Sequence, residues 1–254
     1  MSDLQVAPPL KYSTIAHGDL EVLNPLSVDA IGEAFGAIEA LGLPEAPRIL
    51  DLGCGRAALL AEALTRLGGV GRGLDRNPAF VADGQRLLAR RGLAERATVE
   101  VAEIGPDTVG EGAWDLVMCV GARPFGATLE QNLAGIARLV APGGGVILGE
   151  GYWRRAPEPE YLELLGARPE EMPTRAELDG IGLRAGLRVR RVVEAGFASW
   201  DAYEAAYRDA MLAWCAANPE DPDAARFEAR ARRWYAAYER WGRTTLGFAL
   251  LALG

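Results

Sequence analysis

Two hydrophobic periodicities alternate along the first two thirds of the chain. Short, mostly apolar runs have the length and composition of strands in a parallel sheet, at residues 48–52, 70–74, 97–102, 114–120 and 146–148. Between these runs, apolar residues recur at helical spacing, at residues 57–67, 78–91 and 129–140. Alternating strands and helices predict an α/β, Rossmann-like doubly wound sheet with helices on both faces.

The pattern is less regular after residue 155. Thr174 and Glu177 form a capping-box signature that predicts a helix from Thr174 to Ala185, closed by Gly186. Residues 187–193 then resemble a sixth strand, and residues 244–253 a seventh, which we expect to be an antiparallel edge strand. The expected sheet is therefore seven-stranded and mostly parallel.

Two long helical patterns precede the last predicted strand. They cover about residues 200–217 and 224–241, and Asn218-Pro219 begins the polar turn between them. We expect a two-helix insertion over about residues 198–243, either covering the ligand edge of the sheet or packing beside it. Aromatic side chains recur along one face of each helix.

The first predicted strand ends in the sequence RILDLGCG, which brings an acid and two glycines to the end of an apolar run. Gly53 and Gly55 permit a turn in which backbone approaches a ligand without interference from a Cβ atom. The helical pattern that follows stops at Gly68-Gly69. Strand, glycine turn and helix together predict a nucleotide-type binding site.

Composition narrows the function classes. With 254 residues and 50% hydrophobic content, the chain is long enough for one large α/β core. Its 27 basic and 35 acidic residues give a net charge of −8, which argues against a nucleic-acid partner and favours a small-molecule substrate. The sequence does not indicate an oligomeric state.

The same composition bears on location. The N-terminal sequence lacks the basic and apolar regions of a signal peptide, and no run approaches the roughly 18 apolar residues of a membrane span. Cys54, Cys119 and Cys215 are too scattered for a disulfide framework or a zinc site, and no acidic cluster suggests a metal. We therefore expect a cytoplasmic protein with no membrane or metal partner.

Five stretches of the chain resemble the successive motifs of class I S-adenosylmethionine-dependent methyltransferases: ILDLGCGRAALLAEAL, GRGLDRNP, VEVAEIGPD, WDLVMCVGA and RLVAPGGGVILGE. GEGYWRR and TLGFALLAL are similar to an uncharacterised bacterial branch with a GEPYW-like motif after the fifth strand, although Gly151 replaces its proline. The resemblance implies a methyltransferase domain at residues 45–254, preceded by a helical lid at residues 1–44.

S-adenosylmethionine is the cofactor that this resemblance implies, and its chemistry suits the residues at the motif positions. Asp51 can act on the ammonium group, and Asp75, 20 residues after Gly55, can accept from both ribose hydroxyls. Glu103 matches the family position beside the adenine amine. The predicted cofactor-binding residues are Asp51, Gly53, Cys54, Gly55, Asp75, Arg76, Glu103, Ile104, Cys119 and Gly121.

Alternatives exist for several of these residues. Asp51 and Asp75 are also suited to helix capping, and the two cysteines to packing, because no histidine or paired cysteine accompanies them. Residues 53–58 also match the GxGxxA pattern of dinucleotide-binding proteins, which leaves an NAD-dependent oxidoreductase as a rival. Asp51 and the Pro142-Gly143-Gly144 turn before the fifth strand favour the methyltransferase.

Candidate catalytic residues follow the fifth strand and lie in the N-terminal segment. Glu150 and Tyr152 are expected at the carboxyl edge, where such sheets bind ligands, and His17 has a pKa suited to a general base. Trp153, Trp200 and Tyr203 are candidates for substrate binding through their rings, although aromatic stripes most often pack within the core.

The predicted reaction is direct in-line attack of an acceptor on the sulfonium methyl group. Positive charge on sulfur disappears as the new bond forms, so alignment and exclusion of water matter more than strong acid–base groups. A protein that binds the cofactor without transferring methyl, or that cyclises it, would retain the same glycine turn and is a further alternative.

Overall fold

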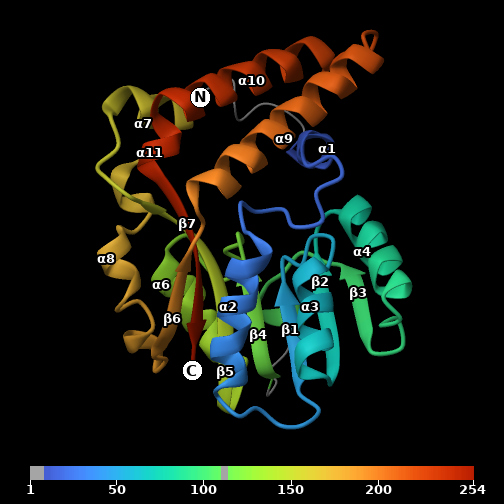
Figure 1. Cartoon of the computed structure of the whole chain (residues 1–254), viewed down its shortest axis with the longest axis vertical. Helices are drawn as coiled ribbons and strands as arrows, with labels where there is room; N and C mark the ends of the chain where they lie inside the picture. The colour runs from blue at the N-terminus through green and yellow to red at the C-terminus, as the bar shows by residue number, and fades with distance from the viewer. Residues whose placement is uncertain (1–8, 110–113) are drawn as a thin grey trace.

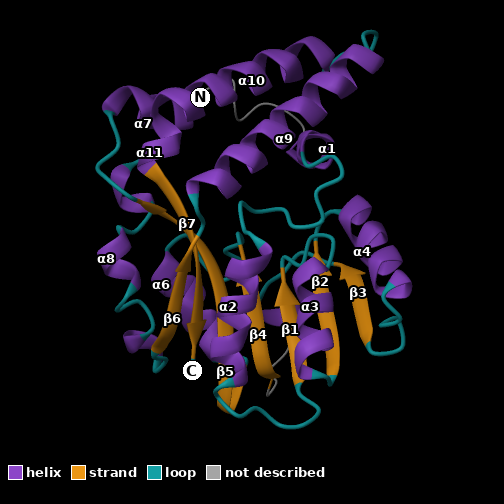
Figure 2. Ribbon diagram, viewed as in Figure 1, coloured by secondary structure: helices purple, strands orange, loops and turns teal. Residues whose placement is uncertain are grey.

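The computed structural model describes residues 9–109 and 114–254, which form a seven-stranded sheet with helices on both faces (Figures 1 and 2). The strand order is β3-β2-β1-β4-β5-β7-β6. The strands are β1 (Arg48–Leu52), β2 (Val70–Asp75), β3 (Ala97–Val101), β4 (Trp114–Val120), β5 (Val140–Trp153), β6 (Val189–Glu194) and β7 (Leu246–Leu253). The predicted fold class is confirmed.

Strand β7 pairs antiparallel with both β5 and β6, and the other neighbouring pairs are parallel. The last strand is antiparallel as expected, but the prediction that it forms an edge was wrong. Residues 247–253 are all buried, which suits an interior strand covered on both faces. Strand β6 forms the edge instead, and its exposed Arg190 and Arg191 suit that position.

Each face of the sheet has its own hydrophobic core. Helices α2 (Val28–Glu39), α3 (Ala58–Leu67) and α4 (Pro78–Arg90) pack on one face, and α5 (Pro106–Val109), α6 (Leu129–Ala137) and α8 (Arg175–Leu178) on the other. Parallel strands buried on both faces are expected to be mostly apolar, and β1 and β4 are apolar apart from Arg48, Asp51 and Asp115. The layers bring the carboxyl ends of β1, β2 and β4 to one edge.

Two predicted elements differ in detail. The helix expected from Thr174 to Ala185 is interrupted: the capping box forms, but α8 ends at Leu178, and a short 3₁₀ helix follows at Leu183–Ala185. Gly180 and Gly182 fall between the two pieces, where glycine weakens a helix. Strand β5 begins at Val140, so the predicted turn after Pro142 is an irregularity of register within a longer strand.

A helical cap lies above the carboxyl edge of the sheet (Figure 1). It consists of α9 (Phe197–Ala217) and α10 (Ala224–Ala237), which continues through a π-helical turn (Tyr238–Gly242) and α11 (Arg243–Thr245) into β7. Helix α7 (Pro159–Leu165) lies near the start of β7, and a short 3₁₀ helix follows it at Pro169–Glu171. The two long helices are the insertion expected before the last strand.

The N-terminal segment divides between the cap and the sheet. Helix α1 (Pro9–Ala16) packs against the cap, where Tyr12 and Ala16 share a core with Met211 and Phe227. Helix α2 instead belongs to the layer that covers the sheet. Of the N-terminal residues that the structure describes, those before α2 thus lie over the ligand edge. None of the helices in the described ranges is both long and apolar enough to cross a membrane.

Candidate functional site

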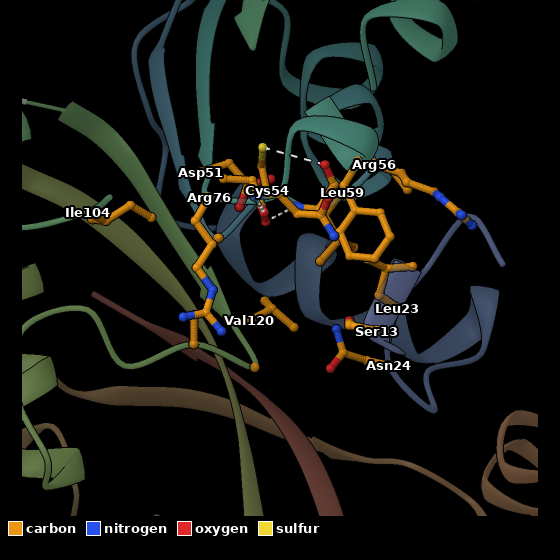
Figure 3. Close-up of a pocket in the computed structure, with 18 of the residues that line it drawn as sticks. Ser13, Leu23, Asn24, Asp51, Cys54, Arg56, Leu59, Arg76, Ile104 and Val120 are labelled. Carbon is orange, nitrogen blue, oxygen red and sulfur yellow. Dashed lines mark hydrogen bonds between the residues drawn. The ribbon is translucent and has the colours of Figure 1, made fainter. Parts of the chain in front are cut away.

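A cavity of about 680 Å³ opens at the carboxyl edge of β1, β2 and β4. In Figure 3, Ile104 lies across this cavity from Leu59. Leu23, Ser13 and Asn24, from the N-terminal segment of the chain, lie together on another side of it. Ten of the predicted site residues line it: His17, Asp51, Gly53, Cys54, Gly55, Asp75, Arg76, Glu103, Ile104 and Gly121. The volume lies within the roughly 300–1,000 Å³ typical of small-ligand sites.

The turn after β1 is held by backbone hydrogen bonds. The amides of Gly53 and Cys54 both donate to the carbonyl of Leu74 on β2, at 2.8 and 3.0 Å. Gly53 and Gly55 have φ angles of +75° and +51°, a region that favours glycine. The Cys54 side chain is nearly buried and packs against Gly73 of β2. Backbone thus forms this wall of the cavity, and the cysteine supports it from behind.

Asp51 is a buried residue near the end of β1 and lies at the base of the cavity. Its side chain is nearly inaccessible, and Oδ2 has no hydrogen-bond partner in the described part of the chain. Burial, together with the nearby charge of Asp75, raises the pKa of Asp51 to about 8. An unpartnered carboxyl oxygen in a cavity wall is suited to a cationic or hydrogen-bond-donating ligand group.

Asp75 ends β2 and is oriented by two backbone amides. Gly55 N donates to Oδ2 and Asn77 N donates to Oδ1, each at 2.8 Å. Asn77 in turn caps α4 by accepting from Ala79 N at 3.0 Å, and its Nδ2 donates to Thr14 Oγ1 at 2.8 Å. The sequence analysis did not single out Asn77, although Asn-Pro before a helical pattern is a recognisable N-cap signal.

Residues 17–24, which we call the strap, cross the cavity between α1 and α2. Arg56 fastens the strap from below: Nη2 donates to Gly18 O at 2.6 Å and Nη1 donates to Leu20 O. A Cβ atom at Gly55 would lie 2.7 Å from Leu23 Cδ1, and one at Gly121 would lie 2.8 Å from Asn24 Oδ1. The strap therefore packs directly over both glycines.

His17 begins the strap and is half-buried. Its Nδ1 lies 2.7 Å from Ser13 O, and its Nε2 lies 3.1 Å from the hydroxyl of Tyr203 on α9. Burial lowers the pKa of His17 below its usual 6.5, with a smaller effect of the same sign from Arg56. The ring also meets the edge of Phe80 at 5.6 Å. His17 therefore lines the cavity on the side of α4.

Comparison with known proteins bears on what this cavity binds. A family model described as a methyltransferase domain matches residues 49–144. The uncharacterized protein YjhP of Escherichia coli is 30% identical over 245 residues, which covers 94% of this chain and 96% of YjhP. The chain belongs to the class I S-adenosylmethionine-dependent methyltransferases.

Other relatives of this methyltransferase agree. The crystal structure of a SAM-dependent methyltransferase from Geobacter sulfurreducens, in complex with S-adenosylhomocysteine, has a TM-score of 0.85 and 28% identity, covering 96% of this chain and 97% of that one. A ubiquinone biosynthesis O-methyltransferase from Alkalilimnicola ehrlichii is 31% identical over 148 residues, 58% of this chain and 56% of that protein. Family membership decides the choice left open by the GxGxxA match in favour of S-adenosylmethionine.

The cavity fits this cofactor by its own chemistry. Asp51 offers a buried oxygen without a partner, the glycines after β1 leave room beside the backbone, and Asp75 is held ready by two amides. Asp51 and Asp75 are thus suited to the ammonium and the ribose hydroxyls, the groups for which the sequence predicted them. Glu103 and Ile104 line the side of the cavity that follows β3.

Six predicted site residues are not among those that line the cavity: Cys119, Glu150, Tyr152, Trp153, Trp200 and Tyr203. Cys119 is fully buried behind the turn that follows β4, with Sγ 3.2 Å from Ala122 O. Tyr152 continues the buried row of Val146 and Leu148 into the core of that face, and its hydroxyl donates to Glu194. Strand alternation thus directs Tyr152 into the core.

The other aromatic candidates also make packing contacts. Trp153 Nε1 donates to Pro169 O at 2.8 Å, and its ring lies in a small core with Tyr161. Trp200 stacks on Tyr238 with 6.2 Å between ring centroids. Tyr203 contacts the strap, so it lies one layer behind the lining residues.

Glu150 contacts a cavity-lining residue, Arg123, that was not predicted from the sequence. Arg123, in the loop after β4, lines the cavity and donates from Nε and Nη2 to the two carboxylate oxygens of Glu150, at 3.0 and 2.8 Å. Arg123 Nη1 also donates to Glu171 O at 3.1 Å. No sequence motif marks this arginine, because its partner is 27 residues away on the neighbouring strand.

Proposed function

We propose that this methyltransferase transfers a methyl group from S-adenosylmethionine to a small-molecule acceptor by direct in-line displacement. The observation that carries the proposal is the enclosure of the cavity: the strap crosses it, and α9 packs behind the strap. Such a covered site suits a small acceptor better than a polymer chain. The net charge of −8 further disfavours nucleic acid as the acceptor.

The cofactor-binding residues that we propose follow the walls of the cavity. Asp51 would hold the ammonium group, Asp75 the ribose hydroxyls and Glu103 the adenine amine. Gly53, Cys54, Gly55, Arg76, Ile104 and Gly121 complete the contact surface, with Cys119 supporting the turn after β4. When bound, S-adenosylmethionine supplies a methyl group on positively charged sulfur.

The surrounding residues supply alignment and exclusion of water, which in-line transfer requires. The strap excludes water from above, and the Arg123–Glu150 pair fixes the loop after β4. Glu150 is therefore proposed as a positioning residue. We propose hydrogen bonding rather than proton abstraction for His17, because its Nδ1 faces Ser13 O and its Nε2 faces a tyrosine hydroxyl. Tyr152 has no proposed part in the chemistry.

The name of one relative supports the acceptor class. The protein from Alkalilimnicola ehrlichii is named as an O-methyltransferase of ubiquinone biosynthesis, and this chain resembles it over 148 residues. We also propose a cytoplasmic setting, since Cys54, Cys119 and Cys215 are free thiols, as is usual in a reducing compartment.

Methyl-labelled S-adenosylmethionine incubated with the protein and a metabolite extract tests the proposal. One extract is filtered to remove macromolecules, and the other is unfiltered. We expect label in a small molecule in both, and none with the Asp75→Ala variant. Label confined to protein or nucleic acid in the unfiltered extract would contradict the proposed acceptor class. Consumption of cofactor without any labelled acceptor would point to cyclisation or cleavage.

A further inference from the structure

The hydroxyl of Tyr203 connects the cap to both ends of the strap. It lies 3.1 Å from His17 Nε2 at the start of the strap and 3.2 Å from Leu23 O near its end. Tyr203 is on α9, and its side chain is partly buried, which raises the pKa of its phenol. The phenol is therefore protonated at neutral pH and has one proton to donate.

With a neutral His17, the side chains carry too few protons to form all the hydrogen bonds around the Tyr203 hydroxyl. Nδ1 lies 2.7 Å from Ser13 O, which only accepts, and 3.3 Å from Ser13 Oγ, which can accept or donate; the shorter contact favours a proton on Nδ1. Nε2 of the neutral ring is then an acceptor, and Tyr203 has two acceptors for one proton. An imidazolium would donate from Nε2 to the phenol oxygen and leave the phenol proton for Leu23 O. All three hydrogen bonds form at once only in that state.

Some of the groups around His17 oppose its protonation, and others favour it. Burial and Arg56, from the turn after β1, lower the pKa of His17, whereas the carbonyls of Ser13 and Leu23 favour the charged ring. Tyr203 and Tyr207 face it from α9, the latter with 5.1 Å between ring centroids, and the apolar Phe80 faces it from α4. The protonated state is therefore expected to accumulate below pH 6.5.

The strap position that these bonds fix is the one that covers the glycine turns. Leu23 packs against Gly55 and Asn24 against Gly121, on the two sides of the cavity formed after β1 and β4. Arg56 holds the middle of the strap from the sheet side, through Gly18 O and Leu20 O. Tyr203 holds it from the cap side. These contacts hold the strap over the glycine turns, so we expect a ligand beneath it to leave faster when they loosen.

We propose that Tyr203 is a positioning residue that latches the strap over the bound cofactor, and that protonation of His17 completes the latch. This inference rests on the proposed function, because it requires the cofactor to lie beneath the strap. It assigns to a cap residue, outside the cavity lining, control over how long the cofactor product stays bound.

The test is the rate of S-adenosylhomocysteine release from wild type, Tyr203→Phe and Tyr207→Phe between pH 5.5 and 7.5. Phenylalanine at 203 keeps the ring and removes the hydroxyl, and Tyr207→Phe removes a hydroxyl from the same helix without touching the strap carbonyls. We expect Tyr203→Phe to release the ligand about three- to tenfold faster at pH 5.5, as loss of a hydrogen bond implies. This ratio should shrink as pH rises, and Tyr207→Phe should match wild type.

Equal release rates for Tyr203→Phe and wild type across this range, or a ratio independent of pH, would overturn the latch alone. Failure of the wild type to bind S-adenosylhomocysteine would overturn the proposed function and the latch together. Amide hydrogen exchange in the ligand-free protein gives a second readout. We expect residues 17–24 to exchange faster in Tyr203→Phe than in wild type, and unchanged exchange there would also contradict the proposal.

Discussion

The base and the cover of the cavity are built from different parts of the chain. At the base, the turns after β1 and β2 are fixed by backbone amides that donate to Leu74 O and to Asp75. The cover is the strap, which long side chains hold by its carbonyl oxygens, Arg56 from below and Tyr203 from above. A base made of backbone is rigid, whereas a cover held by a few side chains can release.

Residues at the base are thus placed to bind the cofactor, whereas residues of the cap support the strap and one another. The carboxylates at the base face the cavity, while the aromatic rings of the cap contact one another or the strap. Changes at the base should therefore affect cofactor affinity, and changes in the cap should affect stability or exchange rates.

Asp75→Ala should have the largest effect on affinity. The substitution removes the predicted ribose contact and leaves the amides of Gly55 and Asn77 without their acceptor. Because hydrogen bonds to a charged group contribute about 1.5–3 kcal/mol each, we expect S-adenosylhomocysteine to bind about 100-fold more weakly by calorimetry. Asp29→Ala, at an exposed position of α2 outside the cavity lining, is the control, and equal affinity for Asp75→Ala and wild type would remove the ribose assignment.

Because of Asp51, both the stability of the cavity base and its affinity for the cofactor product should depend on pH. Its pKa of about 8 lies above that of an unfolded aspartate, so its contribution to stability is fully present below about pH 4 and is lost as pH rises through 8. An ammonium group beside it favours the carboxylate, so binding should release a proton at pH 7. We expect affinity for S-adenosylhomocysteine to rise between pH 6 and 8, by at most about tenfold per unit.

Asp51→Asn supplies the control for that titration. The amide cannot ionise, so the variant should lose this rise in affinity, and the ligand-free protein should gain more stability at pH 8 than at pH 5. The same pH dependence in the variant and the wild type, measured by calorimetry in matched buffers, would show that Asp51 is not the titrating group.

Much of the base was predictable from sequence, and much of the cover was not. Buried parallel strands are mostly apolar runs, and a turn at positive φ favours glycine, so β1, β4 and the turn at Gly53–Gly55 were visible in the sequence. The direction in which Tyr152 points depends on β5 continuing as a long pair with β7, and that pairing is set by contacts about a hundred residues apart. Arg123 was missed because its partner, Glu150, is on a neighbouring strand 27 residues away and no motif links the two.

Trp234→Phe tests whether the cap stabilises the fold without binding the cofactor. Trp234 Nε1 donates at 2.8 Å to Glu204, a buried carboxylate whose pKa burial raises to about 7. Removing Trp234 Nε1 leaves the buried carboxylate of Glu204 without this hydrogen-bond donor, so we expect a loss of about 1–3 kcal/mol in the free energy of unfolding at pH 8. Affinity for S-adenosylhomocysteine should be unchanged, and a loss of affinity larger than the loss of stability would contradict the division between base and cover.

Gly121→Ala should have the smallest effect and acts where base and cover meet. Its φ is +72°, and a methyl group would lie 2.8 Å from Asn24 Oδ1 of the strap. Gly92→Ala has a similar φ of +69° and nothing within 4 Å, so it controls for backbone strain of about 1–2 kcal/mol. We expect both variants to lose similar stability, but only Gly121→Ala to release S-adenosylhomocysteine faster. Equal release rates would show that the strap does not rest on Gly121.

Calorimetric titration of the wild-type protein with S-adenosylhomocysteine, and separately with NADH, tests the central claim that this cavity is an S-adenosylmethionine site. We expect saturable binding of S-adenosylhomocysteine at one site per chain, accompanied by proton release at pH 7, and no binding of NADH. Binding of NADH with no binding of S-adenosylhomocysteine would contradict it.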